Sequence, residues 1–435
     1  MDAAVTSYLT VQEQLAPTLP AAALPWLATL RDEGVKRLRD VGFPTVRDED
    51  WRYTNVRPIL KEPFEIADAE ARVDPSFVLA TAIPSLLCYR LVIVDGIIAR
   101  ELSDTDGLPD GIKVNSLSNL VASEPTRVEP YLGKVVVGDT HGFTAMNAAF
   151  MADGVVIEIA PGQTLDKPLE LLFICSGAGE SVMAQPRNLI VVGKDARLQI
   201  LERYVSAHEQ RSLTNVVTEL VLDENAQVSL YRLQEESGHS FHVGGLFAKL
   251  GPASSLDSLA VTLSGALVRN DLHVELNGNG AEANLRGLYV ARGRQHVDNH
   301  TQVVHNEPGC ISRQHYKGIL DDRAHAVFHG RIVVQPDAQQ TDSEQSNQNL
   351  LLSRDAEIDS KPQLEIYADD VKCSHGATVG QLDTDALFYL KARGIPEDEA
   401  RRMLIGGFAS EVLLTISEEP IKEHLLALVG ARSDN

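Results

Sequence analysis

Ala196-Arg-Leu198 is the first copy of a short pattern that decides the fold. In each copy a small residue, any residue, and an apolar or small residue follow a polar turn. The later copies are Ala226-Gln-Val228, Ser254-Ser-Leu256, Ala281-Glu-Ala283 and Gly309-Cys-Ile311. The steps between copies are 30, 28, 27 and 28 residues. A nearly fixed period of this length is the signature of a repeat architecture, in which each repeat packs on its neighbours.

Small residues also recur at half of this period. Ala324 and Ala338 follow Gly309 at steps of 15 and 14 residues, and Ala356 follows after 18. Between Gly154 and Gln381 the apolar residues form short β-branched runs instead of helical stripes. These runs are 155–159, 189–192, 216–221, 246–250, 272–276 and 332–334. Two strands per repeat without intervening helices predict stacked coils, that is, a parallel β-helix. A β-sandwich is the alternative, although it requires no fixed period.

Helical patterns flank the predicted β-helix, as the open ends of a stacked fold require. Before it, residues 24–41 have apolar side chains at helical spacing, and Asp95-Gly96 separates two β runs as in a hairpin. After it, helical patterns cover 384–392, 397–416 and 420–429. The predicted domains are an N-terminal helical region (1–85), a mixed α/β connection (86–153), the β-helix core (154–383) and a C-terminal helical domain (384–435).

The composition disfavours several classes of partner. The chain has 435 residues and a formal net charge of −22, so it repels phosphate backbones and anionic lipid. No apolar run approaches the roughly 18–20 residues of a bilayer span, and the first residues lack the pattern of a secretory signal. The four cysteines lie far apart and include no C-x-x-C pair. We therefore expect a cytoplasmic protein with free thiols that binds neither nucleic acid nor membrane.

The sequence motifs of several enzyme classes are absent, namely the Walker A loop, a dinucleotide-binding glycine motif and a nucleophile elbow. These absences predict that the chain is not an enzyme. A β-helical carbohydrate-active enzyme, a polysaccharide lyase or hydrolase, is the alternative interpretation, and its carboxylates would converge in a groove. Aromatic residues make up only 5 % of the chain, which is few for stacking on sugars, and the acidic charge opposes polyuronate.

Histidine is concentrated in one part of the chain, because six of the thirteen histidines lie between residues 296 and 329. They are His296, His300, His305, His315, His325 and His329. Neutral imidazole is a common metal ligand, but the stretch contains no H-x-H or H-E-x-x-H motif. In stacked coils, histidines one repeat apart lie above one another. We therefore interpret the cluster first as a surface ladder and second as a metal site.

Cys373-Ser-His375 is a sharper candidate site. In an extended segment, residues two apart project from the same face, so a thiolate and an imidazole would lie side by side as metal ligands. An isolated C-x-H pair is more often a half-buried cysteine beside an unrelated histidine. Two ligands also do not complete a site, because metals and iron–sulfur clusters usually take four. The missing ligands would come from the histidine-rich stretch or from another chain.

Gly406-Gly407 weaken the middle of the helix predicted at 397–416, by about 1 kcal/mol per glycine relative to alanine. The preferred explanation is a tightly packed crossing with another element of the chain. The alternative is a docking surface to which the backbone of a partner comes close.

The block Leu364-Glu-Ile-Tyr-Ala-Asp-Asp-Val-Lys-Cys-Ser-His-Gly-Ala-Thr-Val-Gly380 closely resembles a signature of the SufB/SufD family of iron–sulfur cluster assembly proteins. The resemblance covers most of the chain and is densest from about residue 300 to 410. The Cys-Ser-His-Gly string and the low number of cysteines resemble the SufD branch more than the SufB branch. Further stretches that resemble the family are Asp48-Glu-Asp-Trp51, Ser312-Arg-Gln-His315, Ala326-Val-Phe328, Thr341-Asp342, Asn349-Leu-Leu-Leu352 and Lys361-Pro-Gln363.

The resemblance implies a mainly β fold, a right-handed parallel β-helix flanked by N-terminal and C-terminal α-helical regions, in agreement with the repeat. It also implies a non-catalytic scaffold subunit with two partners. A SufB-type subunit would pair with it through the β-helices. A SufC-type ATPase would bind its C-terminal helices, where Leu404, Phe408 and Val412 are the expected contacts. When the chain is alone, a homodimer is expected in place of the heterodimer.

The resemblance further assigns a role to the Cys-Ser-His block. The family's complex acquires iron, builds a nascent iron–sulfur cluster and passes it to apo-proteins. By this resemblance, His375 and its neighbour Cys373 lie at the interface with the SufB-type partner, as ligands of iron or of the nascent cluster. The cluster is transient and shared with the partner, and the chain alone is expected to bind no cofactor.

Overall fold

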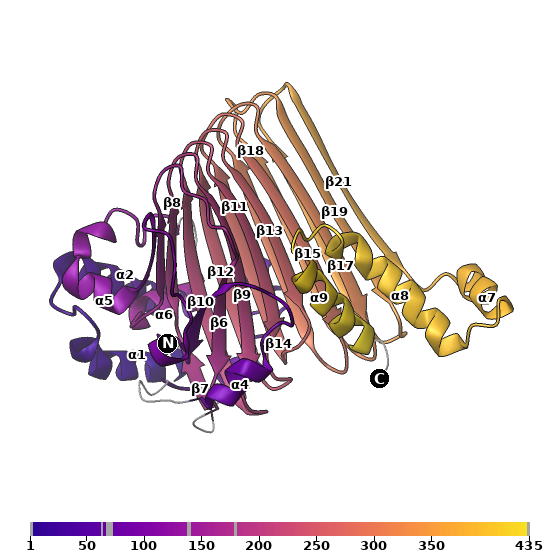
Figure 1. Cartoon of the computed structure of the whole chain (residues 1–435), viewed down its shortest axis with the longest axis horizontal. Helices are drawn as coiled ribbons and strands as arrows, with labels where there is room; N and C mark the ends of the chain where they lie inside the picture. The colour runs from indigo at the N-terminus through magenta and orange to yellow at the C-terminus, as the bar shows by residue number, and fades with distance from the viewer. Residues whose placement is uncertain (1–2, 62–63, 67–72, 137–140, 178–180, 433–435) are drawn as a thin grey trace.

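The computed structural model describes residues 3–61, 64–66, 73–136, 141–177 and 181–432. Most of this part of the chain forms a two-sided β-helix with helices at both ends of the sequence (Figure 1). The helices are α1 (Ala3–Leu15), α2 (Pro25–Val41), α3 (Arg57–Leu60), α4 (Pro75–Ala80), α5 (Leu117–Ser123), α6 (Gly142–Phe150), α7 (Thr384–Ala392), α8 (Glu397–Leu413) and α9 (Glu419–Arg432). The short 3-10 helices are η1 (Ala16–Thr18), η2 (Glu49–Trp51), η3 (Arg100–Leu102) and η4 (Pro125–Arg127).

The strands form two sheets, which we call sheet A and sheet B. Sheet A contains β1 (Glu65–Ile66), β4 (Ile112–Ser116), β5 (Val155–Ile159), β7 (Ser181–Ala184), β8 (Arg187–Val192), β10 (Arg211–Leu222), β12 (Phe241–Leu250), β14 (Leu267–Leu276), β16 (His296–His305), β18 (His325–Val334) and β20 (Glu357–Ile366). Sheet B contains β2 (Tyr89–Val94), β3 (Ile97–Ile98), β6 (Leu169–Cys175), β9 (Arg197–Ser206), β11 (Gln227–Glu235), β13 (Ser255–Thr262), β15 (Glu282–Ala291), β17 (Ile311–Leu320), β19 (Thr341–Leu351) and β21 (Val371–Gly380).

From β8 to β21 successive strands alternate between the two sheets. Each strand pairs in parallel with the strand two places later, so β16 pairs with β18 and β17 with β19. Every two strands therefore form one coil of a parallel β-helix. This confirms the fold predicted from the period, and it excludes the sandwich, whose strands would be mainly antiparallel.

A turn with one left-handed residue explains the repeat in the sequence. Asp195 (φ 59°) and Asn225 (φ 57°) take this conformation, and each is followed by a fully buried alanine. The structure aligns Cys310, not Gly309, with Ala281, since Glu282 pairs with Ile311. Gly309 itself has a φ of 70° and fills the left-handed turn position, which glycine adopts without strain. The last copy of the pattern therefore begins one residue later than we predicted.

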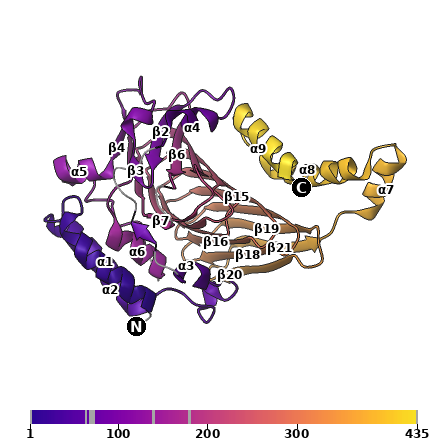
Figure 2. The same cartoon turned by 90° about the horizontal axis from the view of Figure 1, so that it is seen from below.

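Helices cover the outer faces of the two sheets on opposite sides of the β-helix (Figure 2). On sheet A, Phe143 and Met146 of α6 pack with residues of β10, β12 and β14. On sheet B, buried side chains of α8 and α9 pack against β11, β13, β15 and β17. Between the sheets lies a continuous apolar core, for which the strands supply alternate side chains.

The hairpin predicted at Asp95-Gly96 is present. Strands β2 and β3 are antiparallel, and Asp95 (φ 49°) and Gly96 (φ 89°) form the tight turn between them. Strand β2 also pairs with β6, and β4 pairs with β5, so the predicted connection 86–153 already supplies strands to both sheets. In the described ranges, no helix combines the length and apolarity that a membrane span needs.

Candidate functional site

The two sheets end together at the last coil of the β-helix. Strand β21 pairs with β19, and β20 pairs with β18. Within the described ranges no strand pairs with the outer edge of β20 or of β21. The unpaired N–H and C=O groups of such edges are ready to pair with another chain. Exposed apolar side chains, Ile366 on β20 and Val379 on β21, lie at the same end.

Cys373 and His375 both lie on β21. They are two residues apart in an extended strand and therefore project from the same face. Their partners on β19 are Ser343 and Gln345, which are buried between the sheets. Cys373 is half-buried beside the apolar cluster that contains Ile332, whereas His375 is exposed. The pair thus lies at the open end of the interior, where a second chain has access to it.

Below this pair, the part of the interior that lies next to the apolar core is polar. The Ser312 hydroxyl lies 2.9 Å from that of Ser343, directly below Cys373. Gln314, Gln345 and His375 are register partners on β17, β19 and β21. The Gln345 amide donates to the Gln314 carbonyl oxygen over 3.1 Å, directly below His375. The other polar atoms of these two amides, Gln314 Nε2 and Gln345 Oε1, have no hydrogen-bond partner among the described residues. Polar groups therefore extend from the interior to the Cys373–His375 pair.

His305 belongs to the same polar interior and gives a prediction for pH. It is fully buried, its Nε2 lies 2.9 Å from the Ser312 hydroxyl, and burial lowers its pKa from 6.5 to about 4. The unfolded chain binds the proton near pH 6.5 and the folded chain only near pH 4, so stability falls as pH drops through this window. At pH 5 the stability lost through His305 is about 2 kcal/mol.

Thermal melts at pH 7 and pH 5 test this prediction. The melting temperature should fall less between the two pH values for His305→Gln than for the wild type. An equal fall in both would contradict the assignment.

Cys373 is a protonated thiol in the free chain. Burial, and after it the nearby carboxylate of Asp342, raise the pKa of Cys373 above its usual value of 9.0. A thiol with a raised pKa is a poor nucleophile, but a bound cation displaces its proton and stabilises the thiolate. Cys373 is therefore suited to bind a metal supplied to it, and less suited to attack a substrate.

Four of the six histidines of this stretch form ladders as predicted, whereas His305 is buried between the sheets and His315 lies on β17 of sheet B. The rings of His296 and His325 stack edge-on at 4.8 Å, and those of His300 and His329 at 4.6 Å. Both pairs lie on the outer face of sheet A, whereas Cys373 and His375 face the interior from sheet B. The ladders therefore do not complete the Cys373–His375 site.

Within the described ranges, one group of at least three His, Cys, Asp or Glu side chains is close enough to hold a metal ion. It consists of Asp50, His300 and His329, and it contains neither Cys373 nor His375. Sequence reasoning did not select Asp50, because 250 residues separate it from His300 and 279 from His329, and no local motif connects them.

The C-terminal helices use part of their apolar surface inside the chain. Val412 is fully buried in the cluster that joins α8 and α9 to sheet B, so its side chain is not accessible to a partner. Phe408 is half-buried against the same cluster, and Lys317 lies 4.3 Å from the centre of its ring. Leu404 is half-buried. Val412 is therefore corrected from a contact residue to a core residue, and the docking role of Leu404 and Phe408 stays a prediction.

Gly406 and Gly407 do not mark a crossing with another described element of the chain. A Cβ placed on either glycine would meet no atom of the described chain within 4 Å. The preferred explanation, close packing against another element, is therefore wrong for the described part of the chain. The alternative, a close approach by a partner, stays open.

Comparison with known proteins identifies the family to which this chain belongs. The family model described as "SUF system FeS cluster assembly, SufBD core domain" matches residues 173–408, and the "SufBD protein N-terminal region" matches residues 2–171. An iron–sulfur cluster assembly SufBD family protein of Synechocystis is 34 % identical over 94 % of this chain and 91 % of its own. The iron–sulfur cluster assembly protein SufD of Escherichia coli is 32 % identical over 96 % of this chain and 98 % of its own. SufD of Bacillus subtilis is 23 % identical over 93 % of both chains.

The two family models span the N-terminal helices, both sheets, α7 and most of α8, whereas α9 lies beyond the matched residues. They assign the chain to the Suf system and give the carbohydrate-active alternative no support. The chain belongs to the SufB/SufD family of iron–sulfur cluster assembly proteins, and SufD proteins are among the relatives to which it is similar along nearly its whole length.

Proposed function

We propose that this chain is a non-catalytic scaffold subunit of a complex of the SufB–SufC–SufD type, which acquires iron, assembles iron–sulfur clusters and passes them to apo-proteins. The observation that carries this proposal is the incomplete site at the open end of the β-helix. Cys373 and His375 lie side by side on β21, and among the described residues no third His, Cys, Asp or Glu forms a group of ligands with them. A cluster needs about four ligands, so another chain has to supply the rest.

The proposed SufB-type partner pairs with β20 and β21. Two unpaired sheet edges lie at the same end of the molecule as the two ligands, and a second β-helix extends both sheets without leaving a free edge. Cluster assembly then takes place at a junction between chains, with the nascent cluster as cargo and not as a resident cofactor. In the absence of this partner, a second copy of the chain is expected to use the same edges.

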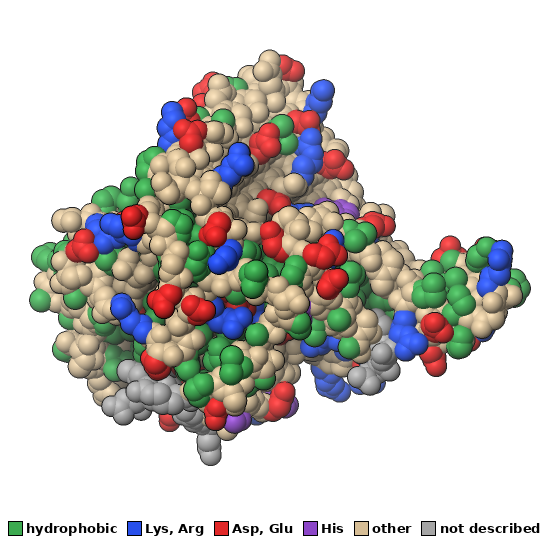
Figure 3. Space-filling view, in the orientation of Figure 1, with side chains coloured by type: hydrophobic (Ala, Val, Ile, Leu, Met, Phe, Trp, Pro, Cys, Tyr) green, Lys and Arg blue, Asp and Glu red, His purple; other side chains and the backbone are tan. Residues whose placement is uncertain are grey.

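The proposed SufC-type ATPase binds α7 and the exposed side of α8. Large apolar side chains are exposed there, namely Phe388 and Tyr389 on α7 and Met403 on α8. In the space-filling view, hydrophobic side chains gather on the part that projects at the right, where Figure 1 shows α7 (Figure 3). Exposed aromatic residues of this kind are typical anchors of protein interfaces. Four free cysteines fit the reducing cytoplasm as the compartment of this assembly.

Co-purification tests this function. A tagged copy of the chain is expressed with its own SufB-type and SufC-type subunits under anaerobic conditions, and the purified material is assayed for subunits, iron and acid-labile sulfide. We expect all three subunits together with iron and sulfide in similar amounts. A chain that purifies without either subunit, under conditions where those two subunits bind each other, would contradict the proposal.

Phe388→Ser should weaken binding of the SufC-type ATPase by one to two orders of magnitude, since loss of a central aromatic anchor costs about 2 kcal/mol. The side chain is 73 % exposed, so the melting temperature of the isolated chain should not change. Leu79→Ser on α4, which removes a side chain that is 74 % exposed, is the matched control and should bind normally. Titration of the ATPase subunit by calorimetry measures both variants, and wild-type affinity in Phe388→Ser would place the docking surface elsewhere.

These single substitutions are preferable to removal of the C-terminal domain. Without residues 384–435, apolar side chains of sheet B such as Leu259 and Ile319 would lose the cover of α8 and α9. A deletion would then combine loss of docking with exposure of a core, and its result would not separate the two.

A further inference from the structure

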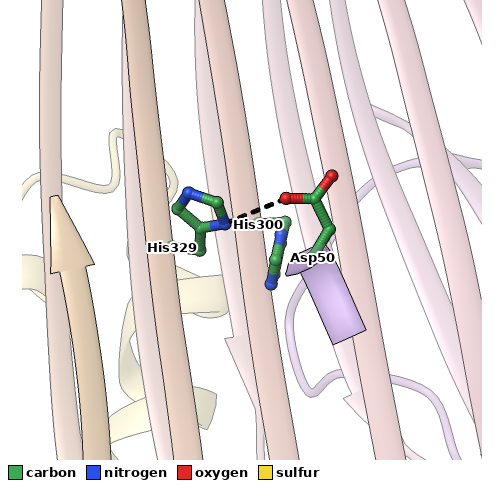
Figure 4. Close-up of side chains that lie close together, drawn as sticks. All are labelled: Asp50, His300 and His329. Carbon is green, nitrogen blue, oxygen red and sulfur yellow. Dashed lines mark ion pairs between the residues drawn. The ribbon is translucent and has the colours of Figure 1, made fainter. Parts of the chain in front are cut away.

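The outer face of sheet A contains a second group of potential metal ligands, separate from Cys373 and His375, which lie on sheet B. His300 on β16 and His329 on β18 are direct partners in the register of the sheet. Asp50, in η2, lies over the two rings, and Figure 4 shows the three side chains converging. One ligand atom of each residue lies within 4.8 Å of the other two, and His329 Nδ1 lies 3.6 Å from Asp50 Oδ1.

Each imidazole has a partner that orients it. Nε2 of His329 lies 2.6 Å from the carbonyl oxygen Oε1 of Gln363, so Nε2 holds the proton and donates it. The lone pair of His329 is then on Nδ1, the nitrogen that faces Asp50. Nε2 of His300 makes an ion-pair contact of 3.1 Å with Oδ1 of Asp298, a carboxylate that is 1 % exposed, although this contact lacks the geometry of a hydrogen bond. A histidine held through one nitrogen by a carboxylate or amide, as His329 is by Gln363, is the usual arrangement of a metal-binding histidine.

The surroundings contain a small cavity and a buried carboxylate oxygen that suit a cation. A cavity of about 10 Å³ lies between Asp50, Asp298 and the two histidines, enough for one water molecule or one ion. Oδ1 of Asp298 is buried and has no hydrogen bond of normal geometry in the described structure. The cations nearby are paired with carboxylates: Lys361 with Glu49 at 2.6 Å, Arg269 with Oδ2 of Asp298 at 2.5 Å and Arg331 with Glu365 at 2.8 Å.

We propose that Asp50, His300 and His329 bind a divalent transition-metal ion, with two imidazole nitrogens and one carboxylate oxygen as ligands. Around an ion with bonds of about 2.1 Å these atoms would lie about 3–4 Å apart, so the group has to close by roughly 1 Å. Asp50 is 66 % exposed and lies in a short 3-10 turn, so it is the residue that moves.

The donor set selects the class of metal. Two imidazoles and a carboxylate suit Zn²⁺ and Fe²⁺, whereas Ca²⁺ and Mg²⁺ prefer oxygen ligands alone and Cu⁺ prefers sulfur. Three protein ligands leave at least one coordination position open to water or to a further donor. The ion would also link the N-terminal segment around Asp50 to two strands of sheet A. This site is independent of the cluster site at β21, because it needs no partner chain.

Zn²⁺ binding to the isolated full-length chain tests the proposal, first by calorimetry after dialysis against a chelator. We expect one Zn²⁺ per chain and a rise in melting temperature with Zn²⁺ concentration, because the ion binds the folded state. Asp50→Asn keeps the shape of an exposed side chain and removes its charge, so it should fold normally and bind Zn²⁺ at least tenfold more weakly. His329→Gln should show the same loss.

His325→Gln is the matched control. His325 lies on the same strand as His329 and stacks on His296 in the same way. Its ring is bonded to Asp359, and among the described residues it belongs to no group of three ligands. We expect it to bind Zn²⁺ like the wild type. Zn²⁺ affinity that is unchanged in Asp50→Asn, or no binding by the wild type, would overturn the proposal. Neither outcome affects the test by co-purification, which measures iron and sulfide in the complex.

Discussion

Glu219→Ala should lower the free energy of unfolding by about 3–5 kcal/mol, because it leaves a buried arginine without its counter-ion. Glu219 on β10 is completely buried, and Arg187 on β8 is 2 % exposed. The guanidinium of Arg187 donates to one oxygen of Glu219 from Nε (3.0 Å) and Nη2 (2.6 Å). The backbone N–H groups of Gly133 and Val135 also donate to this carboxylate, over 2.8 and 3.0 Å.

Urea unfolding of the isolated chain measures the effect. The matched control is Glu224→Ala, since Glu224 pairs with Lys194 at 2.8 Å but both side chains are more than half exposed. An exposed pair contributes about 0–1 kcal/mol, so the control should unfold close to the wild type. If Glu219→Ala also lay within 1 kcal/mol of the wild type, the buried ion pair would not hold the 133–135 segment on sheet A as described.

His375→Ala should reduce the iron and sulfide of the co-expressed complex to background while the complex still forms. In the proposed function His375 is a ligand at the junction with the SufB-type partner, and removal of one ligand opens the site. Because the side chain is exposed, we expect the stability of the chain to change by only about 0.5 kcal/mol. The two readouts therefore separate a ligand from a structural residue.

Ser374→Ala is the control for His375. Ser374 is an exposed neighbour on β21, and it projects from the opposite face of the strand. The control complex should contain wild-type amounts of iron and sulfide. A His375→Ala complex with wild-type iron and sulfide would remove His375 from the site, and a chain that fails to fold would make it a structural histidine.

The repeat made the fold predictable from the sequence. A left-handed turn residue followed by a small buried one is a local requirement, and each coil repeats it, so five copies at similar spacing were visible without any tertiary information. The start of the last copy was predicted at Gly309 and lies at Cys310. Glycine fits both the left-handed turn position and the small buried position that follows it, so the pattern alone did not separate them. The hairpin at Asp95-Gly96 was predictable for the same reason, since its turn chemistry is local.

Contacts between distant segments were not predictable. The position of Asp50 above His300 depends on how the N-terminal segment crosses sheet A, and Trp51 beside it packs on Arg269 at 4.1 Å. Helical spacing placed Val412 on the apolar face of its helix but did not indicate which element would cover that face. In the structure, sheet B covers it. Cys373 and His375 were found because they are adjacent on one strand. Their completion by a partner involves a second chain, whose position one sequence does not give.

Hydrogen–deuterium exchange of β20 and β21 tests the central claim, that the open end of the β-helix pairs with the SufB-type subunit. The isolated chain is measured at a concentration at which it is monomeric, and then in the co-purified complex. The account predicts that the amides on the outer edges of these two strands exchange rapidly in the isolated chain and slowly in the complex. Rapid exchange at both edges in an intact, cluster-containing complex would show that the partner binds elsewhere and would contradict the account.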